Sequence, residues 1–209
     1  GFAAHAAAST LTLDVYNPGE KAIFPVTSVL VSGEKDAILV DAQFGKSQAE
    51  QVVEKIRASG KQLTTIYISH GDPDYYFGLD TLTKAFPQAK VLASQPTVDH
   101  IKHTVDGKLA FWGPKMGTDI PARTIVPDVL KGDSLMLEGQ KLQVVGLDGK
   151  QPDRSFVWIP SIKAVVGGVV VAENIHVWMA DTQTEQSRRD WLGTLDAIVD
   201  YVAERLSAR

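Results

Sequence analysis

The sequence predicts an α/β fold in which a β-sandwich is flanked by helices. Three observations predict it: short strand patterns begin the chain, a strand–helix–strand segment lies in its middle, and further strand patterns precede a long amphipathic helix at its end. The chain has 209 residues, enough for one large domain with a well-buried core. We find no linker, internal repeat or low-complexity tract. We therefore expect a single domain over residues 1–209, with residues 1–9 as a flexible start.

The strand and helix patterns alternate with turn residues along the first half of the chain. Strands are expected at 11–17, 24–33, 37–43, 64–69 and 89–94. An amphipathic helix is expected at 47–60, with Ser47 as its N-cap and Gly60 as its stop. Shorter helices are expected at 77–86 and at 94–106, the second ending at Gly107.

The second half begins with a stretch rich in glycine and proline, 108–122, which we expect to be a surface excursion carrying Phe111 and Trp112. Residues 135–147 predict a hairpin that turns at Glu138–Gly139. Two further strands are expected at 155–160 and 163–171, and a closing helix at 184–206.

Composition limits the classes of partner. Hydrophobic residues make up 44% of the chain and charged residues 22%, as in ordinary soluble globular proteins. The net charge is −4 and no Lys/Arg cluster is present, so we expect no nucleic-acid partner. No apolar run approaches the roughly 20 residues of a membrane span, so we expect no membrane partner either. A small-molecule substrate or ligand remains, with a partner protein as the alternative.

Cysteine usage and the first residues bear on chemistry and location. The chain has no cysteine, which excludes disulfides, thiolate metal ligands and a cysteine nucleophile. The start GFAAHAAAS contains Ala4-His5-Ala6, which fits the A-x-A pattern of a signal-peptidase site and favours a periplasmic or secreted protein. A flexible start or an expression remnant on a cytoplasmic chain is the alternative.

The stretch SHGDPDYYFG, 69–78, concentrates the chemistry of the chain. His70, Asp72 and Asp74 stand at every second position after an apolar strand, and Tyr75 follows them directly. Imidazole and carboxylate groups are metal ligands and proton carriers, so the loop predicts a functional site. The alternative is a polar loop whose aspartates cap the next helix.

The segment 37–94 resembles the first half of the metallo-β-lactamase superfamily. The order AILVDAQ, helix, TTIYISHGDPDYYFGL, helix, AKVLAS matches that family, whose signature H-x-H-x-D-H follows a strand and precedes a glycine-led helix. GLDGKQPDRSFVWIP (146–160) and KAVVGGVVV (163–171) resemble the stretches that carry a later metal histidine and a bridging aspartate. The resemblance implies an αββα sandwich with its site at one edge.

Carried over residue by residue, the resemblance implies a reduced metal site. His70 and Asp74 match the first histidine and the aspartate of the signature, whereas its other two histidines fall on Asp72 and Tyr75. The metal ligands implied are therefore His70, Asp72 and Asp74. Replacing imidazole nitrogen by carboxylate oxygen favours manganese or iron over zinc. One divalent ion of these three is expected, with a metal-free site as the alternative.

The later ligand positions favour the metal-free alternative. The later histidine falls on Lys150, and the bridging aspartate falls on Gly168. A protonated lysine repels a metal ion, and it could instead pair with Asp72 or Asp74 as a fixed positive charge. A solvated loop lysine is the plainer interpretation of Lys150.

Catalytic roles follow from these alternatives. With a metal, bound water would be activated at the three ligands, and Tyr75 or Lys150 would stabilise the oxyanion. Without one, His70 would act as general base, oriented by an aspartate such as Asp74.

Further polar residues are weighed for supporting roles. Asp41, at the end of the strand ILVD, matches a family position behind the metal loop, which implies that it supports the site by hydrogen bonding. His176, after a strand, is a candidate for the edge of the site, although a hydrogen-bonded loop histidine is commoner. His100 and His103 have an i, i+3 spacing that is more typical of surface histidines than of metal ligands.

Two function classes follow. The first is a divergent hydrolase of an ester, lactone, thioester or amide bond, which is the chemistry that the resemblance implies. The second is a non-catalytic relative with a metal-free cleft that binds a small ligand or a partner protein. Bound metal, or a strongly shifted pKa at His70, would discriminate between them.

Overall fold

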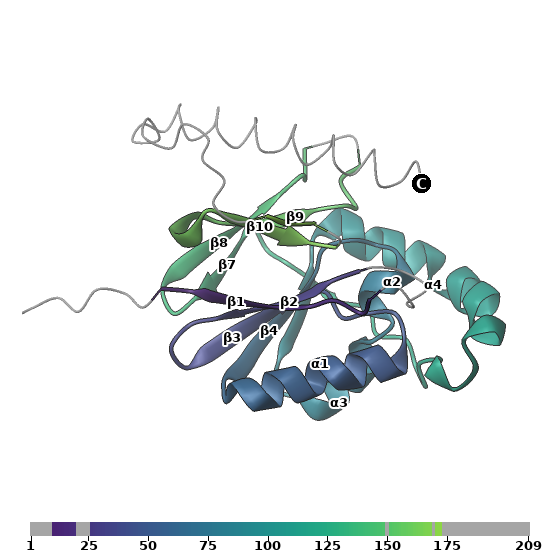
Figure 1. The fold of residues 1–209 in the computed structure, drawn as a ribbon. Helices are drawn as coiled ribbons and strands as arrows, with labels where there is room; N and C mark the ends of the chain where they lie inside the picture. Colours follow the sequence, from purple (N-terminus) through teal and green to yellow (C-terminus); the bar gives the residue numbers. More distant parts are fainter. Residues whose placement is uncertain (1–9, 20–25, 149–150, 169, 173–209) are drawn as a thin grey trace, which may run out of the picture.

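The computed structural model describes residues 10–19, 26–148, 151–168 and 170–172, and in them the chain forms two β-sheets packed face to face, with helices outside the first (Figure 1). The first sheet has the strand order β1-β2-β3-β4-β5-β6, and the second has the order β11-β10-β9-β8-β7. Figure 1 shows α1 and α3 on one side of the first sheet and the second sheet on its other side. The expected α/β sandwich is confirmed.

The strands and helices have the following bounds. The first sheet contains β1 (Thr12–Tyr16), β2 (Ser28–Ser32), β3 (Asp36–Val40), β4 (Gln62–Ile68), β5 (Lys90–Ala93) and β6 (Asp128–Val129). The second contains β7 (Ser134–Leu137), β8 (Gln140–Val145), β9 (Phe156–Ile159), β10 (Ala164–Gly167) and β11 (Val170–Ala172). The helices are α1 (Lys46–Ser59), α2 (Pro73–Tyr76), α3 (Leu79–Ala85) and α4 (Gln95–Met116), with short 3₁₀ turns at η1 (Gly117–Asp119) and η2 (Pro160–Ile162).

The first sheet is buried on both faces, and strand β3 shows how. Ala37 and Leu39 of β3 belong to the core that packs under α1, α3 and α4. Ile38 and Val40 belong to the second core, which lies between the two sheets. Because successive strand residues point to opposite faces, one apolar strand supplies both cores, and its run AILV is apolar throughout.

Strand direction decides where a site can form. β1, β2 and β3 pair antiparallel, whereas β3, β4, β5 and β6 run parallel. The carboxyl ends of β3 and β4 therefore lie at the same edge of the sheet, and the loops that follow them, 41–45 and 69–72, meet there. Ligands of α/β sheets bind at this kind of edge.

Two expectations about helix ends were wrong. Helix α1 has Gly45 rather than Ser47 as its N-cap, and Gln48 reaches back to accept the Gly45 N–H at 3.0 Å. Ser47 instead donates its N–H and its hydroxyl to Asp119, a contact between residues 72 positions apart that no local pattern indicates.

Helix α4 continues beyond Gly107 to Met116, so most of the expected surface excursion is helical. Glycine inside a helix costs about 1 kcal/mol relative to alanine, and burial on this helix outweighs it. Val105 and Met116 are buried in the core, and Leu109 and Trp112 pack against it. The strand expected at 163–171 is instead two antiparallel strands, β10 and β11, because the chain turns back at Gly167 and Gly168, whose φ angles are 147° and 59°. The other expected strands and helices are present within the described residues, and the expected helix at 184–206 lies outside them. No helix in the described part of the chain is long and apolar enough to cross a membrane.

Candidate functional site

The loop that begins SHGD leaves strand β4 at the shared edge and is held by backbone hydrogen bonds on both sides. Ser155 donates its N–H to the Ser69 carbonyl oxygen at 2.7 Å, and Gly71 donates its N–H to the Asp153 carbonyl oxygen at 3.1 Å. Helix α2 follows, with Asp72 at its N-cap position but without a capping side-chain hydrogen bond. The alternative, in which the Asp72 side chain only caps a helix, therefore does not hold for α2.

Asp41 lies beneath this loop and is fully buried. Its carboxylate accepts three hydrogen bonds, from the Ser69 N–H (2.8 Å), the Ser69 hydroxyl (2.7 Å) and the Gly168 N–H (2.6 Å). Its backbone has a φ of 71°, in the left-handed region that aspartate tolerates better than most residues. Burial raises the pKa of Asp41 to about 6, although the hydrogen bonds from Ser69 and Gly168 oppose that shift.

Asp41 reaches His70 through Ser69, since the Ser69 hydroxyl lies 2.7 Å from His70 Nδ1. The Ser69 hydroxyl has one hydrogen, which it donates to Asp41, so we assign the hydrogen on Nδ1 as the donor to Ser69. The neutral imidazole then keeps its lone pair on Nε2. Burial lowers the pKa of His70 to about 3, and the positive charge of Arg154 acts in the same direction, so the ring is neutral at physiological pH.

His70 is enclosed by aromatic rings. The Tyr75 ring is stacked on its face, with centroids 4.3 Å apart and planes 7° from parallel, and Phe156 meets it edge-on at 5.1 Å. Only 4% of His70 and 8% of Tyr75 is exposed. Burial, followed by the charges of nearby aspartates, raises the pKa of Tyr75 above its ordinary value, so its hydroxyl stays protonated. These two side chains shape the interior of the site rather than its surface.

Arg154 brings a positive charge to the site, and no motif in the sequence singled it out. Residues 70 and 154 form an isolated antiparallel β-bridge, and the guanidinium Nη2 lies 3.6 Å from Asp72 Oδ2. The signal that could have found it is positional, because Arg154 directly precedes the strand pattern SFVWIP as His70 directly follows TTIYIS. It places near Asp72 a fixed positive charge of the kind that one interpretation assigned to Lys150.

Asp74 completes the polar rim of the site. Burial raises its pKa to about 6, and the negative charge of Asp72 adds to this effect, while Lys108 and Arg154 oppose it. Asp72, Asp74 and Arg154 are each partly exposed, unlike His70. They are therefore the groups of this site that can meet a ligand from outside.

His100, which we did not favour as a site residue, packs on the loop. Its ring stands so close to Gly71 that a Cβ there would lie 2.5 Å from His100 Cδ2. His100 Nδ1 also lies 3.7 Å from Asp153 Oδ2. His103, one helical turn further on, is exposed and is not part of this contact.

The predicted metal ligands do not form a metal-holding group with one another. Within the described residues, no three His, Asp or Glu side chains are grouped so that they could hold a metal ion. Asp72 is paired with Arg154, His70 has its Nδ1 engaged, and Gly168 stands where a bridging aspartate was implied. Lys150 and His176 lie outside the described residues, so their predicted roles stay predictions.

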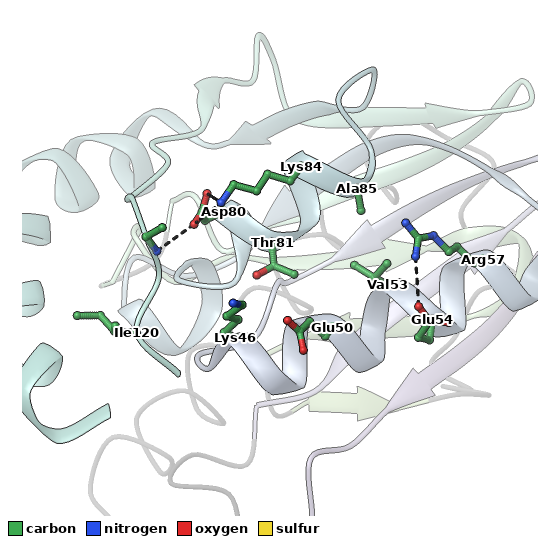
Figure 2. A pocket seen from close by; sticks show the side chains of 11 residues that line it. Lys46, Glu50, Val53, Glu54, Arg57, Asp80, Thr81, Lys84, Ala85 and Ile120 are labelled. Carbon is green, nitrogen blue, oxygen red and sulfur yellow. Dashed lines mark hydrogen bonds and ion pairs between the residues drawn. The ribbon is translucent and has the colours of Figure 1, made fainter. Parts of the chain in front are cut away.

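A cavity of about 450 Å³ lies elsewhere, between α1 and α3 (Figure 2). Its walls carry charges of both signs that pair with one another: Arg57 lies 3.2 Å from Glu54, and Lys84 lies 3.4 Å from Asp80. Except for the buried Asp80, these charged side chains are exposed on the helix surfaces, and none of the residues of the 69–78 loop lines this cavity.

The comparison with protein families decides the identity of the fold. A family model described as the metallo-beta-lactamase superfamily matches residues 23–208. The chain belongs to the metallo-β-lactamase superfamily. A curated relative, the uncharacterized protein YobT of Bacillus subtilis (strain 168), is 36% identical over 74 residues, which are 35% of this chain and 31% of that protein. The match thus spans less than a third of that relative.

Solved structures show the same metallo-β-lactamase fold at low identity. The B3 metallo-beta-lactamase BLEG-1 matches with a TM-score of 0.53 and 15% identity, over 71% of this chain and 68% of that one. A metallo-beta-lactamase from Pontibacter korlensis matches with a TM-score of 0.52 and 18% identity, over 75% and 66%. A metallo-beta-lactamase family protein from Thermus thermophilus matches with a TM-score of 0.52 and 15% identity, over 73% and 58%.

Proposed function

We propose that this chain is a divergent hydrolase of the metallo-β-lactamase superfamily that cleaves an ester, lactone, thioester or amide bond at the rim formed by Asp72, Asp74 and Arg154. One observation carries the proposal: a guanidinium and two carboxylates gather at the carboxyl ends of parallel strands, over a buried and neutral His70. Groups that stabilise an oxyanion and accept a proton are what hydrolysis of a carbonyl compound requires.

The residues divide the chemistry as follows. Asp74, a partly exposed carboxylate, takes a proton from the attacking water, whose oxygen bonds to the carbonyl carbon. The oxyanion that forms is stabilised by the Arg154 guanidinium. When the tetrahedral species collapses, the leaving alkoxide, thiolate or amine takes the proton back from Asp74. Asp72 positions Arg154 through their ion pair.

The buried network holds these groups in place. Asp41, Ser69 and His70 are joined by hydrogen bonds, and Arg154 is bridged to His70 through the backbone. The His, Asp and Glu side chains of the described residues are not grouped so that they could hold a metal ion, so no step of the proposed reaction depends on a metal. Roles for Lys150 as a second cation and for Tyr75 as a hydrogen-bond donor belong to the same proposal and need separate tests.

The experiment is a panel of chromogenic ester, lactone, thioester, amide and β-lactam substrates, assayed with the protein after chelation and again with zinc, manganese or iron added. We expect turnover that does not require the added metal. Asp74→Asn and Arg154→Met should each lower kcat/KM by about 100-fold or more, the scale of a lost general base or oxyanion donor.

Matched controls lie on the exposed face of α4. Asp106→Asn makes the same change as Asp74→Asn, and Lys102→Met likewise replaces a cationic side chain by methionine, both at exposed positions outside the rim; they should leave turnover unchanged. Absence of turnover across the panel would contradict the proposal and would leave the non-catalytic relative, to be tested by ligand binding. Equal loss in site and control variants would show that folding rather than catalysis is affected.

A further inference from the structure

We propose that Tyr75 and Gly168 form an interlocked pair that closes the space beside His70 to a metal ion. The inference concerns metal occupancy and does not depend on the hydrolase activity, because metal is measured on the protein itself. It arises from the disagreement between the family, whose resemblance implies metal ligands at these two positions, and the packing of the side chains that are present.

The first step is steric. A Cβ on Gly168 would lie 2.8 Å from Tyr75 Cε1 and 3.2 Å from both the Tyr75 hydroxyl oxygen and His70 Cε1. Carbon atoms do not approach this closely without displacement, so no side chain fits at 168 while the Tyr75 ring is in place. The φ of Gly168 is 59°, which further disfavours a replacement. An aspartate at this position and a tyrosine at 75 are therefore mutually exclusive in this packing.

The second step shows that Gly168 cannot easily move away. Its N–H donates to Asp41 Oδ2 at 2.6 Å, and its carbonyl oxygen accepts the Thr27 N–H at 2.8 Å and the Thr27 hydroxyl at 2.5 Å. Both sides of the residue are thus fixed to buried partners. A side chain added at 168 would have to displace Tyr75 rather than the backbone.

The third step concerns His70 itself. Tyr75 covers one face of the imidazole, Phe156 lies against it edge-on, and Nδ1 is bound to Ser69. Arg154 is bridged to His70 through the backbone, and its guanidinium Nη2 lies 3.6 Å from Asp72 Oδ2, so its positive charge would repel a divalent cation here. A metal ion would need the space that Tyr75 fills and would meet a guanidinium beside it.

The experiment compares two double variants that differ only in the ring at position 75. Tyr75→His with Gly168→Asp removes the phenol and provides two donors, whereas Tyr75→Phe with Gly168→Asp keeps a six-membered ring in the same place. Zinc and manganese stoichiometry is measured by elemental analysis after loading and buffer exchange, and affinity by calorimetry. We expect no bound metal at His70 in the unmodified chain and about one equivalent of zinc in the first double variant only.

Each outcome decides the proposal. Stoichiometric zinc in the unmodified chain that is lost on His70→Gln would overturn it. A folded Tyr75→His/Gly168→Asp variant that binds no zinc would also overturn it, since the pair would then not be what closes the site. If that variant does not fold, Tyr75→His alone is compared with Tyr75→Phe: a zinc affinity at least about tenfold higher supports the proposal, and equal affinities refute it.

Discussion

The hydroxyl of Tyr67 ties the two sheets together beneath the site, and removing it gives a sharp test of the structure. Tyr67 is fully buried in the core between the sheets, and its hydroxyl lies 2.6 Å from the hydroxyl of Ser155, the residue directly before β9. Ser155 donates its own hydrogen to the Ser69 carbonyl oxygen at 2.9 Å, so Tyr67 must be the donor to Ser155. Burial raises the pKa of Tyr67 above its ordinary value, which keeps this donor protonated.

Because Tyr67 donates to Ser155, removing the donor and removing the acceptor should lower the free energy of unfolding by different amounts. Tyr67→Phe removes a donor and leaves Ser155 still bonded to Ser69, so we expect a loss of about 1 kcal/mol in the free energy of unfolding. Ser155→Ala leaves the Tyr67 hydroxyl as a buried donor without its acceptor. An unsatisfied buried donor costs about 1–3 kcal/mol, so we expect a loss of about 2 kcal/mol in the free energy of unfolding. The double variant removes both polar groups and should be no less stable than Ser155→Ala.

Urea unfolding of the four proteins, followed by tryptophan fluorescence and circular dichroism, measures this cycle. The two single losses sum to about 3 kcal/mol, and the double variant should fall short of that sum by about 1 kcal/mol or more. The midpoint of thermal unfolding should fall by about 2–4 °C for each kcal/mol. Additive losses, or a Tyr67→Phe variant that is less stable than Ser155→Ala, would refute the assignment of donor and acceptor.

Three further predictions concern charge and close packing. Burial raises the pKa of Asp41 to about 6, so the protonated carboxyl group stabilises the fold at low pH and this contribution is lost as the pH rises through about 6. The free energy of unfolding is measured with urea at about pH 4 and at about pH 7, for the unmodified chain and for Asp41→Asn. The difference between the two proteins should shift against the unmodified chain by about 2 kcal/mol from the lower to the higher pH. Gly71→Ala places a Cβ against His100 and should lower the thermal midpoint, and a second change of His100→Ala should restore it. The Glu138 carboxylate accepts hydrogen bonds from backbone N–H groups of the turn at 33–36. Desolvation raises the pKa of Glu138, but these hydrogen bonds lower it by more, so its pKa lies below the ordinary value. Glu138→Ala should therefore lower the thermal midpoint at neutral pH, and the difference from the unmodified chain should vanish as acid protonates the carboxylate.

Strand positions could be predicted from the sequence because their signals are local. Apolar runs bounded by Gly, Pro and Asp mark β2, β3 and β4, and each of these runs feeds both cores. The extent of α4 could not be predicted, since Gly107 and Pro114 are local signals for a helix end. The burial of residues on that helix depends on strands far away in the sequence, and it overrode the local preference.

The candidate site divides in the same way. The loop at 69–78 could be located because a polar triplet directly after an apolar strand is a local pattern. The place of Arg154 could not be predicted, because it depends on a bridge to His70, which lies far earlier in the chain. The enclosure of His70 was equally hidden, since it requires Tyr75, Phe156 and Gly168 to meet from three separate segments.

The geometry also explains how this loop can hold its conformation without a metal ion. Its backbone is fixed by Ser155 and Asp153, and its floor is fixed by the Asp41–Ser69 hydrogen bonds. None of these four residues is one of the implied metal ligands, so the loop does not depend on a metal ion for its conformation. Substitutions at 72 and 75 therefore change the charge and the volume of the site while leaving its backbone in position. That separation lets the Arg154 guanidinium and the Tyr75 ring fill the region where the resemblance implies metal ligands.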